Sequence, residues 1–245
     1  MTEEATDSLV IIPTYNEKDN VEDIIDAVIS LAPYFDVLIV DDGSPDGTGE
    51  LVKKKKIEHN DRVHLLERRG KLGLGTAYIA GFNWGLEKGR YKYLFEMDAD
   101  FSHNPDDLLR LRSACLSGAD FAIGSRYVEG GSVVDWSWER VLLSYGASWY
   151  VRTILGMPIK DPTAGFKCYK KDVLEIIDLE KVDFVGYAFQ IAMKYSAISL
   201  GFKAKEVPIR FKDREKGQSK MSIGIFKEAL TGVWKMKRRN FRKNM

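Results

Sequence analysis

The feature that most constrains this chain is a set of short apolar segments, each followed directly by polar and turn-forming residues. The segments are too short for buried helices, and their Val, Ile and Leu content is typical of strands covered on both faces. Between them the apolar spacing becomes helical, as at Val21–Ile29 behind the capping candidates Asp19 and Asn20. This alternation predicts an α/β fold with a doubly wound, mainly parallel sheet and flanking helices. The predicted strands are Leu9–Ile12, Val37–Val40, Val63–Leu66, Tyr93–Phe95 and Phe121–Ile123.

Three further segments have helical character. Thr76–Lys88 has the spacing, and Asn104 with Pro105 forms a cap and first-turn pair for a helix that ends at Cys115. Trp138–Met157 is rich in Trp, Tyr, Leu and Val, with few charges. Two interpretations of it stay open: a core helix, or an amphipathic helix lying in a lipid interface, where Trp and Tyr are favoured.

Composition excludes several classes of protein. The 245 residues are 44% apolar and 30% charged, which fits one compact globular unit, and the net charge of +1 disfavours a nucleic-acid binder. The two cysteines, Cys115 and Cys168, lack zinc-ligand spacing and suggest no disulfide framework. Residues 1–8 lack the basic start and apolar stretch of a secretory signal, and no apolar run reaches the roughly 18 residues of a spanning helix. We therefore expect a cytoplasmic protein.

Paired carboxylates follow two of the predicted strands. Asp98 and Asp100 come directly after a strand, and two like charges held so close favour a shared cation, with oxygen ligands suited to Mg²⁺ or Mn²⁺. Asp41 and Asp42 end another strand, where an acidic side chain can accept hydrogen bonds from a nucleoside. In each case the alternative is a plain turn or helix cap.

Glycines and cations follow the other strands. Gly73 and Gly75 open a helix but lack the third glycine of a dinucleotide fingerprint. The remaining interpretation is that they let the backbone approach an anion closely at the helix start, and Lys71 adds a positive charge there. Cations stand beside small residues in 124–127, 161–167 and 213–220. Each alone would be read as a surface ion pair, but together they suggest contacts with several phosphates.

These motifs, taken in order, resemble the dolichol-phosphate mannosyltransferases, which are inverting family 2 glycosyltransferases of GT-A fold. The resemblance spans nearly the whole chain. It rests on Ile12–Glu17, Val40–Ser44, Lys71–Thr76, Met97–Asp100, Gly124–Arg126, Thr163–Phe166, and Asp213 and Arg214 with Ser219 and Lys220.

The resemblance implies a role for each matching residue. Asp98, Ala99 and Asp100 would hold the metal and diphosphate, and Arg126, Arg214 and Lys220 would contact phosphates and position the acceptor. Departures fall at Ser102, where some relatives carry a Gln metal ligand, and at Lys167, where Arg is frequent. The nucleoside would be held by Pro13, Tyr15, Glu17, Val40 and Asp42.

The resemblance also implies substrates and partners. The donor would be GDP-mannose, with UDP-glucose or another nucleotide sugar as the alternative, and the acceptor a polyprenyl or dolichyl phosphate. Q-x-x-R-W is absent, which favours transfer of a single sugar over processive synthesis. Many relatives carry C-terminal membrane helices that this sequence lacks, so we expect peripheral attachment to the cytoplasmic face of a membrane or a separate membrane-anchoring subunit.

The chain is predicted to divide into a catalytic domain at residues 1–220 and an amphipathic, basic segment at 221–245. From Trp234 to Lys243 basic and aromatic side chains interleave, which fits either contact with anionic lipid or a solubilising tail. Two rival functions are a receiver-like switch protein and a nucleotide-sugar-binding subunit without catalysis. The cations beyond residue 120 disfavour the first, and the retention of Asp98, Asp100, Arg126, Arg214 and Lys220 disfavours the second.

Overall fold

A seven-stranded sheet forms the centre of the computed structural model, which describes residues 6–184, 186–213, 232–239 and 241–243. The strand order is β3-β2-β1-β4-β7-β5-β8, and all neighbours are parallel except that β7 runs antiparallel to both β4 and β5. The doubly wound, mainly parallel sheet predicted from the sequence is confirmed. The strands are β1 (Ser8–Thr14), β2 (Phe35–Asp41), β3 (Val63–Glu67), β4 (Tyr93–Glu96), β5 (Phe121–Ser125), β7 (Lys167–Lys170) and β8 (Ala204–Pro208).

Helices cover both faces of the sheet, and alternate residues of β1 show why. Leu9 and Ile11 pack into one apolar cluster, whereas Val10 and Ile12 pack into the other, so the strand is buried on both sides. One cluster includes α1 (Val21–Leu31), α2 (Thr48–Glu58) and α4 (Asp107–Leu116). The other includes α3 (Leu74–Lys88), α5 (Trp138–Leu155), α6 (Lys171–Ile176) and α7 (Tyr187–Ser199). Short 3-10 turns occupy Asn60–Arg62 and Leu179–Lys181.

Two predicted helix caps need correction, although α1 begins at Val21 as predicted. Asn20 is the residue that precedes α1, but its side chain does not cap the helix; its amide donates to Glu17 Oε2 at 2.9 Å instead. Helix α4 begins at Asp107, because Asn104 and Pro105 form a turn in which Asn104 Oδ1 accepts a hydrogen bond from the Asp106 N–H. In both places the polar side chain stabilises the preceding loop.

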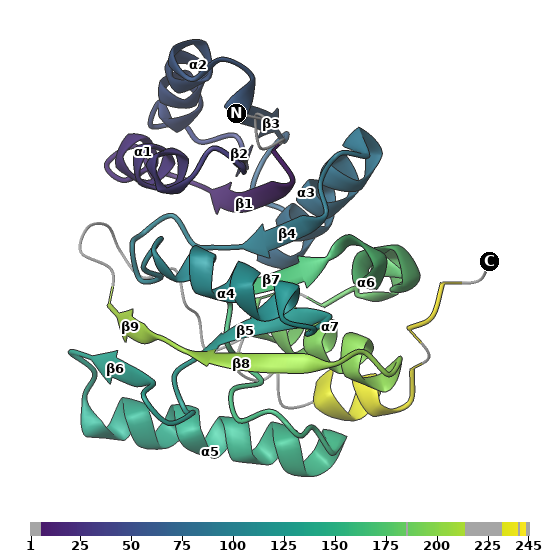
Figure 1. Cartoon of the computed structure of the whole chain (residues 1–245). Coiled ribbons are helices and arrows are strands. Elements are labelled where there is room, and N and C mark those ends of the chain that lie inside the picture. Colours follow the sequence, from purple (N-terminus) through teal and green to yellow (C-terminus); the bar gives the residue numbers. More distant parts are fainter. Residues whose placement is uncertain (1–5, 185, 214–231, 240, 244–245) are drawn as a thin grey trace.

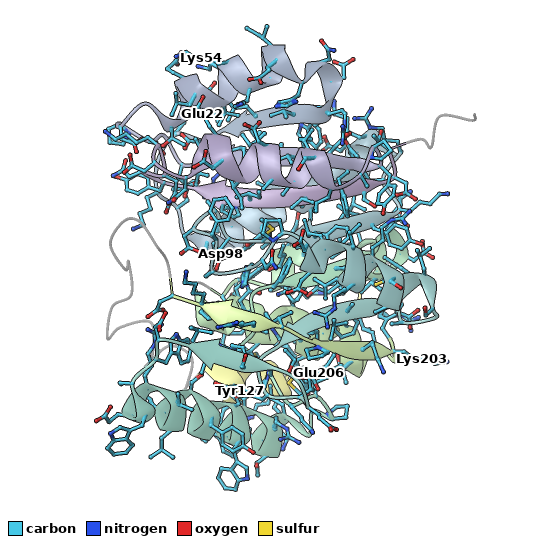
Figure 2. The ribbon with its side chains drawn as sticks, turned by 60° about the vertical axis from the view of Figure 1, so that its left-hand side comes forward. Glu22, Lys54, Asp98, Tyr127, Lys203 and Glu206 are labelled. Atoms are coloured by element: carbon cyan, nitrogen blue, oxygen red, sulfur yellow. The ribbon has the colours of Figure 1, made fainter. Side chains whose placement is uncertain are left out.

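Helix α5 is not a core helix, which corrects one of the two interpretations of this segment. Figure 1 shows it beyond edge strand β8, at the end of the molecule opposite to α1 and α2, and in Figure 2 its side chains project outward. Only Ser148, Val151 and Leu155 are buried. The apolar residues on its other side are largely exposed: Trp138, Leu142, Leu143, Tyr145 and Trp149.

The C-terminal residues that the structure describes pack back onto the body of the protein. A helical turn at 232–237 buries Val233 and Met236, and Phe241 is buried beyond it. The segment is therefore more than a solvated tail. The predicted division at residue 220 falls outside the described residues and stays a prediction. Within the described part of the chain, no helix has both the length and the apolar character needed to cross a bilayer.

Cys115 and Cys168 lie 53 residues apart in the sequence but side by side in the fold. Cys115 is on α4 and Cys168 on β7, both are buried and free, and their sulfur atoms are 3.6 Å apart. The crossover of α4 onto this face of the sheet brings them together, which no spacing rule could have indicated.

Candidate active site

The predicted site residues gather along one edge of the sheet, where the parallel strands end. Pro13 in β1 pairs with Val40 in β2, and Asp42 follows β2 directly. Asp98 follows β4, and Arg126 follows β5. Because parallel strands end on the same side, residues that are far apart in the sequence share one surface. Arg214 and Lys220, the remaining predicted phosphate contacts, lie outside the described residues.

The acidic pair that ends β2 has two distinct environments. Asp41 is the last residue of β2, and its carboxylate fixes the turn that follows: it accepts hydrogen bonds from Thr14 Oγ1 at 2.8 Å and from the Ser44 N–H at 2.9 Å. Asp42 instead accepts two hydrogen bonds from the guanidinium of Arg68, at 2.6 and 2.9 Å. Arg68 was not predicted, and its position directly after a strand was the only available signal. The pairing fixes the plane of the Asp42 carboxylate at the edge of the site.

The loop after β1 is held against the start of α2. The Glu17 N–H donates to Thr48 Oγ1 at 3.0 Å, and the Glu17 carboxylate accepts from Asn20. Tyr15 is close to Lys71, whose ammonium lies 5.2 Å from the centre of the tyrosine ring. Two segments predicted to contact the donor, the loop after β1 and the loop that contains Lys71, are thus neighbours of one another.

The loop after β4 presents Asp98 and Asp100 differently. The Asp98 side chain is 39% exposed, whereas Asp100 is only 7% exposed and accepts a hydrogen bond from the Ser102 N–H at 3.1 Å. Between Asp100 and Ser102, Phe101 has a φ of 59°, a left-handed conformation that is strained for an aromatic residue. Such strain is often retained at functional sites.

The chemistry of the two carboxylates fits a divalent ion that is shared with a diphosphate. Within the described part of the chain, no further His, Cys, Asp or Glu joins them in a cluster tight enough to chelate an ion. Mg²⁺ is commonly held by one or two carboxylates, with its other ligands supplied by substrate phosphates and water. A pair of hard oxygen ligands at a partly open edge matches that pattern, and Mn²⁺ accepts the same ligands.

The buried side chain of His103 holds the backbone of the loop that carries Asp98 and Asp100. Its Nδ1 atom accepts a hydrogen bond from the Asp98 N–H at 3.2 Å, and its ring stacks on Phe166 with centroids 4.8 Å apart. Burial lowers the pKa of His103 below its ordinary value, although the nearby Asp98 and Asp100 act in the opposite direction. A neutral ring with an acceptor at Nδ1 suits that hydrogen bond. Sequence reasoning missed His103 because its stacking partner, Phe166, comes from a distant segment.

Arg126 is held by the most extensive set of contacts in the site. Its Nε and Nη2 atoms donate to the two oxygens of Asp161 at 2.8 and 2.7 Å, and Nη2 also donates to Thr163 Oγ1 at 2.7 Å. Burial would raise the pKa of Asp161, but the charge and hydrogen bonds of Arg126 lower it below its ordinary value. Asp161, which was recognised only as part of a basic cluster, is therefore the fixed partner of Arg126.

A small two-stranded sheet closes the site on the far side of Arg126. It consists of β6 (Ser132–Val134) and β9 (Arg210–Lys212), which are parallel. The rings of Trp136 and Phe211 each lie 5.6 Å from the Arg126 guanidinium carbon. Asp213, at the end of the described segment, accepts hydrogen bonds from Trp136 and from Arg140 of α5. This is a direct link between the site and α5.

The two glycines of the 73–75 segment serve different purposes. Gly73 has a φ of 101° and precedes α3, a conformation that favours glycine. Gly75 was expected to allow a close approach to a ligand, but it allows close packing of protein instead. A Cβ atom there would lie 2.5 Å from the Phe184 carbonyl oxygen and 2.9 Å from the Phe189 ring.

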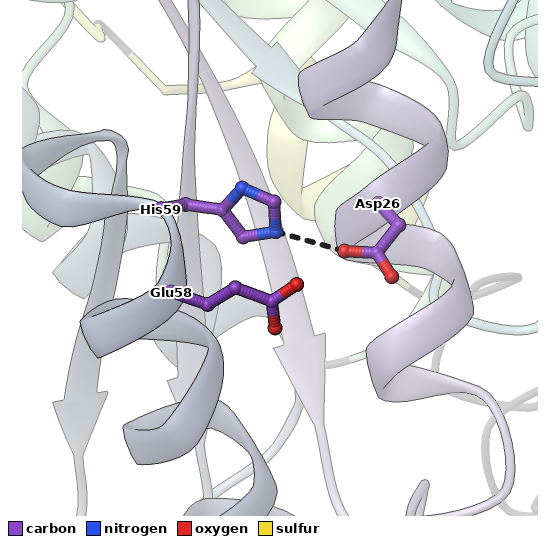
Figure 3. A group of neighbouring side chains, drawn as sticks. All are labelled: Asp26, Glu58 and His59. Carbon is purple, nitrogen blue, oxygen red and sulfur yellow. Dashed lines mark hydrogen bonds and ion pairs between the residues drawn. The ribbon is translucent and has the colours of Figure 1, made fainter.

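A second group of potential ligands lies between α1 and α2. Figure 3 shows Asp26, Glu58 and His59, with a hydrogen bond of 2.9 Å from His59 Nε2 to Asp26. The ammonium of Lys55 pairs with both carboxylates, at 2.7 and 3.0 Å. The Lys55 side chain is itself largely buried. This group is an ion-pair network that joins two helices, and we assign it no chemistry.

Comparison with known proteins gives two kinds of match. The profile of glycosyl transferase family 2 matches residues 9–177. Polyprenol monophosphomannose synthase of Mycolicibacterium smegmatis is 52% identical over 226 residues, which cover 92% of this chain and 85% of the relative. Undecaprenyl-phosphate mannosyltransferase of Micrococcus luteus is 48% identical over 225 residues, which cover 92% of this chain and 91% of the relative.

Solved structures share the fold at low sequence identity. Glucosyl-3-phosphoglycerate synthase from Mycobacterium tuberculosis, in complex with Mn²⁺, UDP and phosphoglyceric acid, superposes with a TM-score of 0.70 at 16% identity, covering 95% of this chain and 79% of that one. Mannosyl-3-phosphoglycerate synthase from Rubrobacter xylanophilus gives a TM-score of 0.63 at 18% identity, covering 94% and 72%. At this level of identity, the likeness concerns the fold alone.

Proposed function

The chain belongs to glycosyl transferase family 2, and from this premise we propose that it transfers one mannose from GDP-mannose to a polyprenyl or dolichyl phosphate. The observation that carries the proposal is the pairing of two features on one sheet edge. The acidic pair Asp98 and Asp100, which follows β4, suits a diphosphate with its cation, and Arg126, which follows β5 at the same edge, suits a second phosphate. Two relatives of about half-identical sequence, each named for mannose and a polyprenyl lipid, support the same substrates.

The donor side is assigned to the ends of β1 and β2. Pro13, Tyr15, Glu17, Val40 and Asp42 form the nucleoside site in this proposal, and the Asp42 carboxylate is held in one plane by Arg68. Lys71, beside the Tyr15 ring, adds a positive charge near the donor phosphates. These residues come from adjacent strand ends, so one nucleotide can reach all of them.

The acidic loop is assigned to the cation. Asp98 and Asp100 would hold Mg²⁺ or Mn²⁺, with Ala99 between them near the diphosphate. When bound, the ion supplies positive charge that stabilises the departing nucleoside diphosphate. The protein contributes the fixed geometry of the loop, through the Ser102 N–H on Asp100 and the His103 ring below Asp98.

The acceptor needs no general base. A phosphate monoester has a second pKa of about 6 and is already a nucleophile near neutral pH, so the site must instead bring two anions together. Arg126, with Arg214 and Lys220 from the segment outside the described residues, supplies cations for this purpose. A phosphate oxygen then attacks the anomeric carbon as the bond to the diphosphate breaks, which inverts the configuration.

A lipid acceptor requires the site to face a membrane, and the exposed side of α5 fits that role. Residues 138, 142, 145 and 149 repeat at intervals of four, three and four, which places Trp138, Leu142, Tyr145 and Trp149 on one side of the helix. Trp234, which is also exposed, contacts α5 next to this face, because its indole N–H donates to the Tyr150 hydroxyl at 3.1 Å. Trp and Tyr are favoured in the interfacial zone of a bilayer.

Charge around the α5 face favours the anionic cytoplasmic side of a membrane. The helix carries a single acidic residue, Glu139, and the adjacent C-terminal segment presents exposed cations at Lys235, Lys237 and Arg238. Each such cation near an anionic surface contributes on the order of 1 kcal/mol of binding. We assign the protein to a peripheral position at that surface, with or without a separate membrane-anchoring subunit.

A donor panel tests the proposal. Purified protein with Mg²⁺ or Mn²⁺ and polyprenyl phosphate in vesicles is given GDP-mannose, UDP-glucose or another nucleotide sugar, and lipid-linked product is scored. The expected result is mannolipid from GDP-mannose. Product from UDP-glucose alone would reassign the donor, and hydrolysis of donor without lipid product would exclude the acceptor.

A further inference from the structure

Helix α7 carries two polar side chains into the interior behind the site. Gln190 and Lys194 are one helical turn apart, so they lie on the same side of the helix, and they are 3% and 0% exposed. Burial, and next the charge of Lys167, lower the pKa of Lys194 well below its ordinary value. A buried ammonium is costly, and a methionine would fill a similar volume without that cost. The position of Lys194 therefore calls for an explanation beyond packing.

Lys194 contacts the segment that holds Arg126. Its ammonium donates to the Ala164 carbonyl oxygen at 2.5 Å. Ala164 lies between the residues that fix Arg126 and the start of β7. On one side of it are Asp161, with two hydrogen bonds from the Arg126 side chain, and Thr163, with a third. Lys194 thus contacts the backbone directly after the Asp161–Thr163 cradle, which is the segment whose side chains hold the guanidinium of Arg126.

The same helix also braces the acidic loop. Gln190 Oε1 accepts a hydrogen bond from Lys167 at the start of β7, and the Lys167 ammonium is 2.9 Å from Glu96 Oε1. Glu96 ends β4, two residues before Asp98. Through these buried contacts, one face of α7 is connected both to the segment that holds Arg126 and to the segment that leads to Asp98.

We propose that Lys194 is a positioning residue for the acceptor phosphate, acting through Ala164 and the Asp161–Thr163 cradle on the guanidinium of Arg126. This inference rests on the proposed function, because it takes Arg126 as an acceptor contact. It differs from a purely structural role for Lys194. A structural role predicts that stability and activity fall together, whereas a positioning role predicts that they separate.

The variant that distinguishes the two roles is Lys194→Met, with Lys55→Met as the matched control. Lys55 is also a largely buried lysine, but it pairs with Asp26 and Glu58 between α1 and α2. For K194M we expect a melting temperature within about 5 °C of the wild type or higher, because replacing a buried charge by an apolar side chain is often neutral or stabilising. We also expect kcat/KM for polyprenyl phosphate to fall at least about tenfold, while the affinity for GDP-mannose with Mg²⁺ stays within about threefold. K55M should leave all three quantities near wild type.

A double-mutant cycle tests the route of the effect. Thr163→Val removes the hydrogen bond between Thr163 and Arg126 but keeps the two to Asp161, so K194M and T163V should be non-additive in kcat/KM for the acceptor if both act on the same guanidinium. Additive losses would overturn the inference. If K194M does not fold, Lys194→Gln carries the test, because its amide is too short to reach Ala164 and should give the same selective loss.

Failure of this inference is distinguishable from failure of the proposed function. If the wild type forms no mannolipid, the function is wrong. If the wild type and K194M form mannolipid with equal kcat/KM, or if K194M loses donor affinity as much as acceptor turnover, the function stands and the positioning role is wrong.

Discussion

The guanidinium of Arg126 donates one hydrogen bond to each carboxylate oxygen of Asp161, at 2.8 and 2.7 Å, and both side chains are nearly inaccessible to solvent. A charge pair this deeply buried has paid a large desolvation cost and is weak evidence for a stabilising role. Its planar, two-pronged geometry instead fixes where a positive charge stands at the edge of the sheet. This geometry supports our proposal that Arg126 contacts the acceptor phosphate.

Breaking this pair from one side should cost both stability and activity. Arg126→Met leaves the Asp161 carboxylate buried and unpaired, which should lower the free energy of unfolding by about 3–5 kcal/mol. Adding Asp161→Leu removes that carboxylate and should restore most of the stability but none of the lipid transfer. Denaturant unfolding and a transfer assay on both variants check this. A double variant as unstable as R126M would contradict our account of the pair.

Substituting Gly75 should disturb packing between α3 and α7. Gly75→Ala places a methyl group 2.5 Å from the Phe184 carbonyl, and we expect a loss of about 1–3 kcal/mol in the free energy of unfolding. Gly146→Ala in α5 is the matched control, because its methyl group would meet nothing within 4 Å. Gly146→Ala should instead stabilise the helix by about 0.5–1 kcal/mol. Thermal unfolding of both variants measures the difference in stability, and equal changes in the two variants would contradict our account of Gly75.

Stability should depend on pH in the alkaline range through Lys194. Its pKa is well below the ordinary 10.5 in the folded state, where burial and Lys167 lower it and Asp161 and Glu96 oppose them. Between the folded-state pKa and 10.5 the unfolded chain binds more protons, so the free energy of unfolding gains a contribution that rises with pH. K194M lacks this contribution. The stability of wild type relative to K194M should therefore increase from pH 7 to 10 in urea titrations, and parallel curves would show that Lys194 titrates normally.

The α5 face should determine binding to anionic vesicles. Substituting Leu142 and Trp149 with Ser removes two exposed apolar side chains, and should weaken sedimentation with vesicles at least about tenfold. Serine substitutions at Ile57 and Leu116, which are also largely exposed but lie on other parts of the surface, should have little effect. Equal loss from both pairs would mean that general hydrophobicity, not this face, drives binding. Truncation after Trp234 is a poor substitute, because it removes the buried residues Met236 and Phe241.

The sequence was sufficient for the parallel strands β1, β2, β3, β4 and β5, but the parallel edge strand β8 was not predicted, because its residues include Lys205 and Glu206. Strands such as β1 and β2 are buried on both faces, and this gives them continuous apolar runs that are easy to recognise. The residues after these strands could be assigned to a common edge because parallel strands end together. The antiparallel strand β7 was not predicted, because Lys167–Lys170 contains two lysines, and the burial of Lys167 depends on Glu96 from another strand.

The contacts within the site could not be predicted for a similar reason. The important contacts join residues that are far apart in the sequence and meet only in the folded chain. They are Arg68 with Asp42, Asp161 with Arg126, and His103 with Phe166. Helix α5 shows the same limit. Its composition was compatible with both a core helix and a helix in a lipid interface, and only its position beyond β8 argues against the core helix.

The most direct test of the account is the affinity for GDP-mannose with and without a divalent ion. Calorimetric titration of chelator-treated protein, repeated after addition of Mg²⁺ or Mn²⁺, should show at least about tenfold tighter binding with the ion, because two carboxylates and a diphosphate repel one another without it. Asp100→Ala should abolish this difference together with turnover. Undiminished affinity and mannolipid synthesis in the chelated protein would contradict the account.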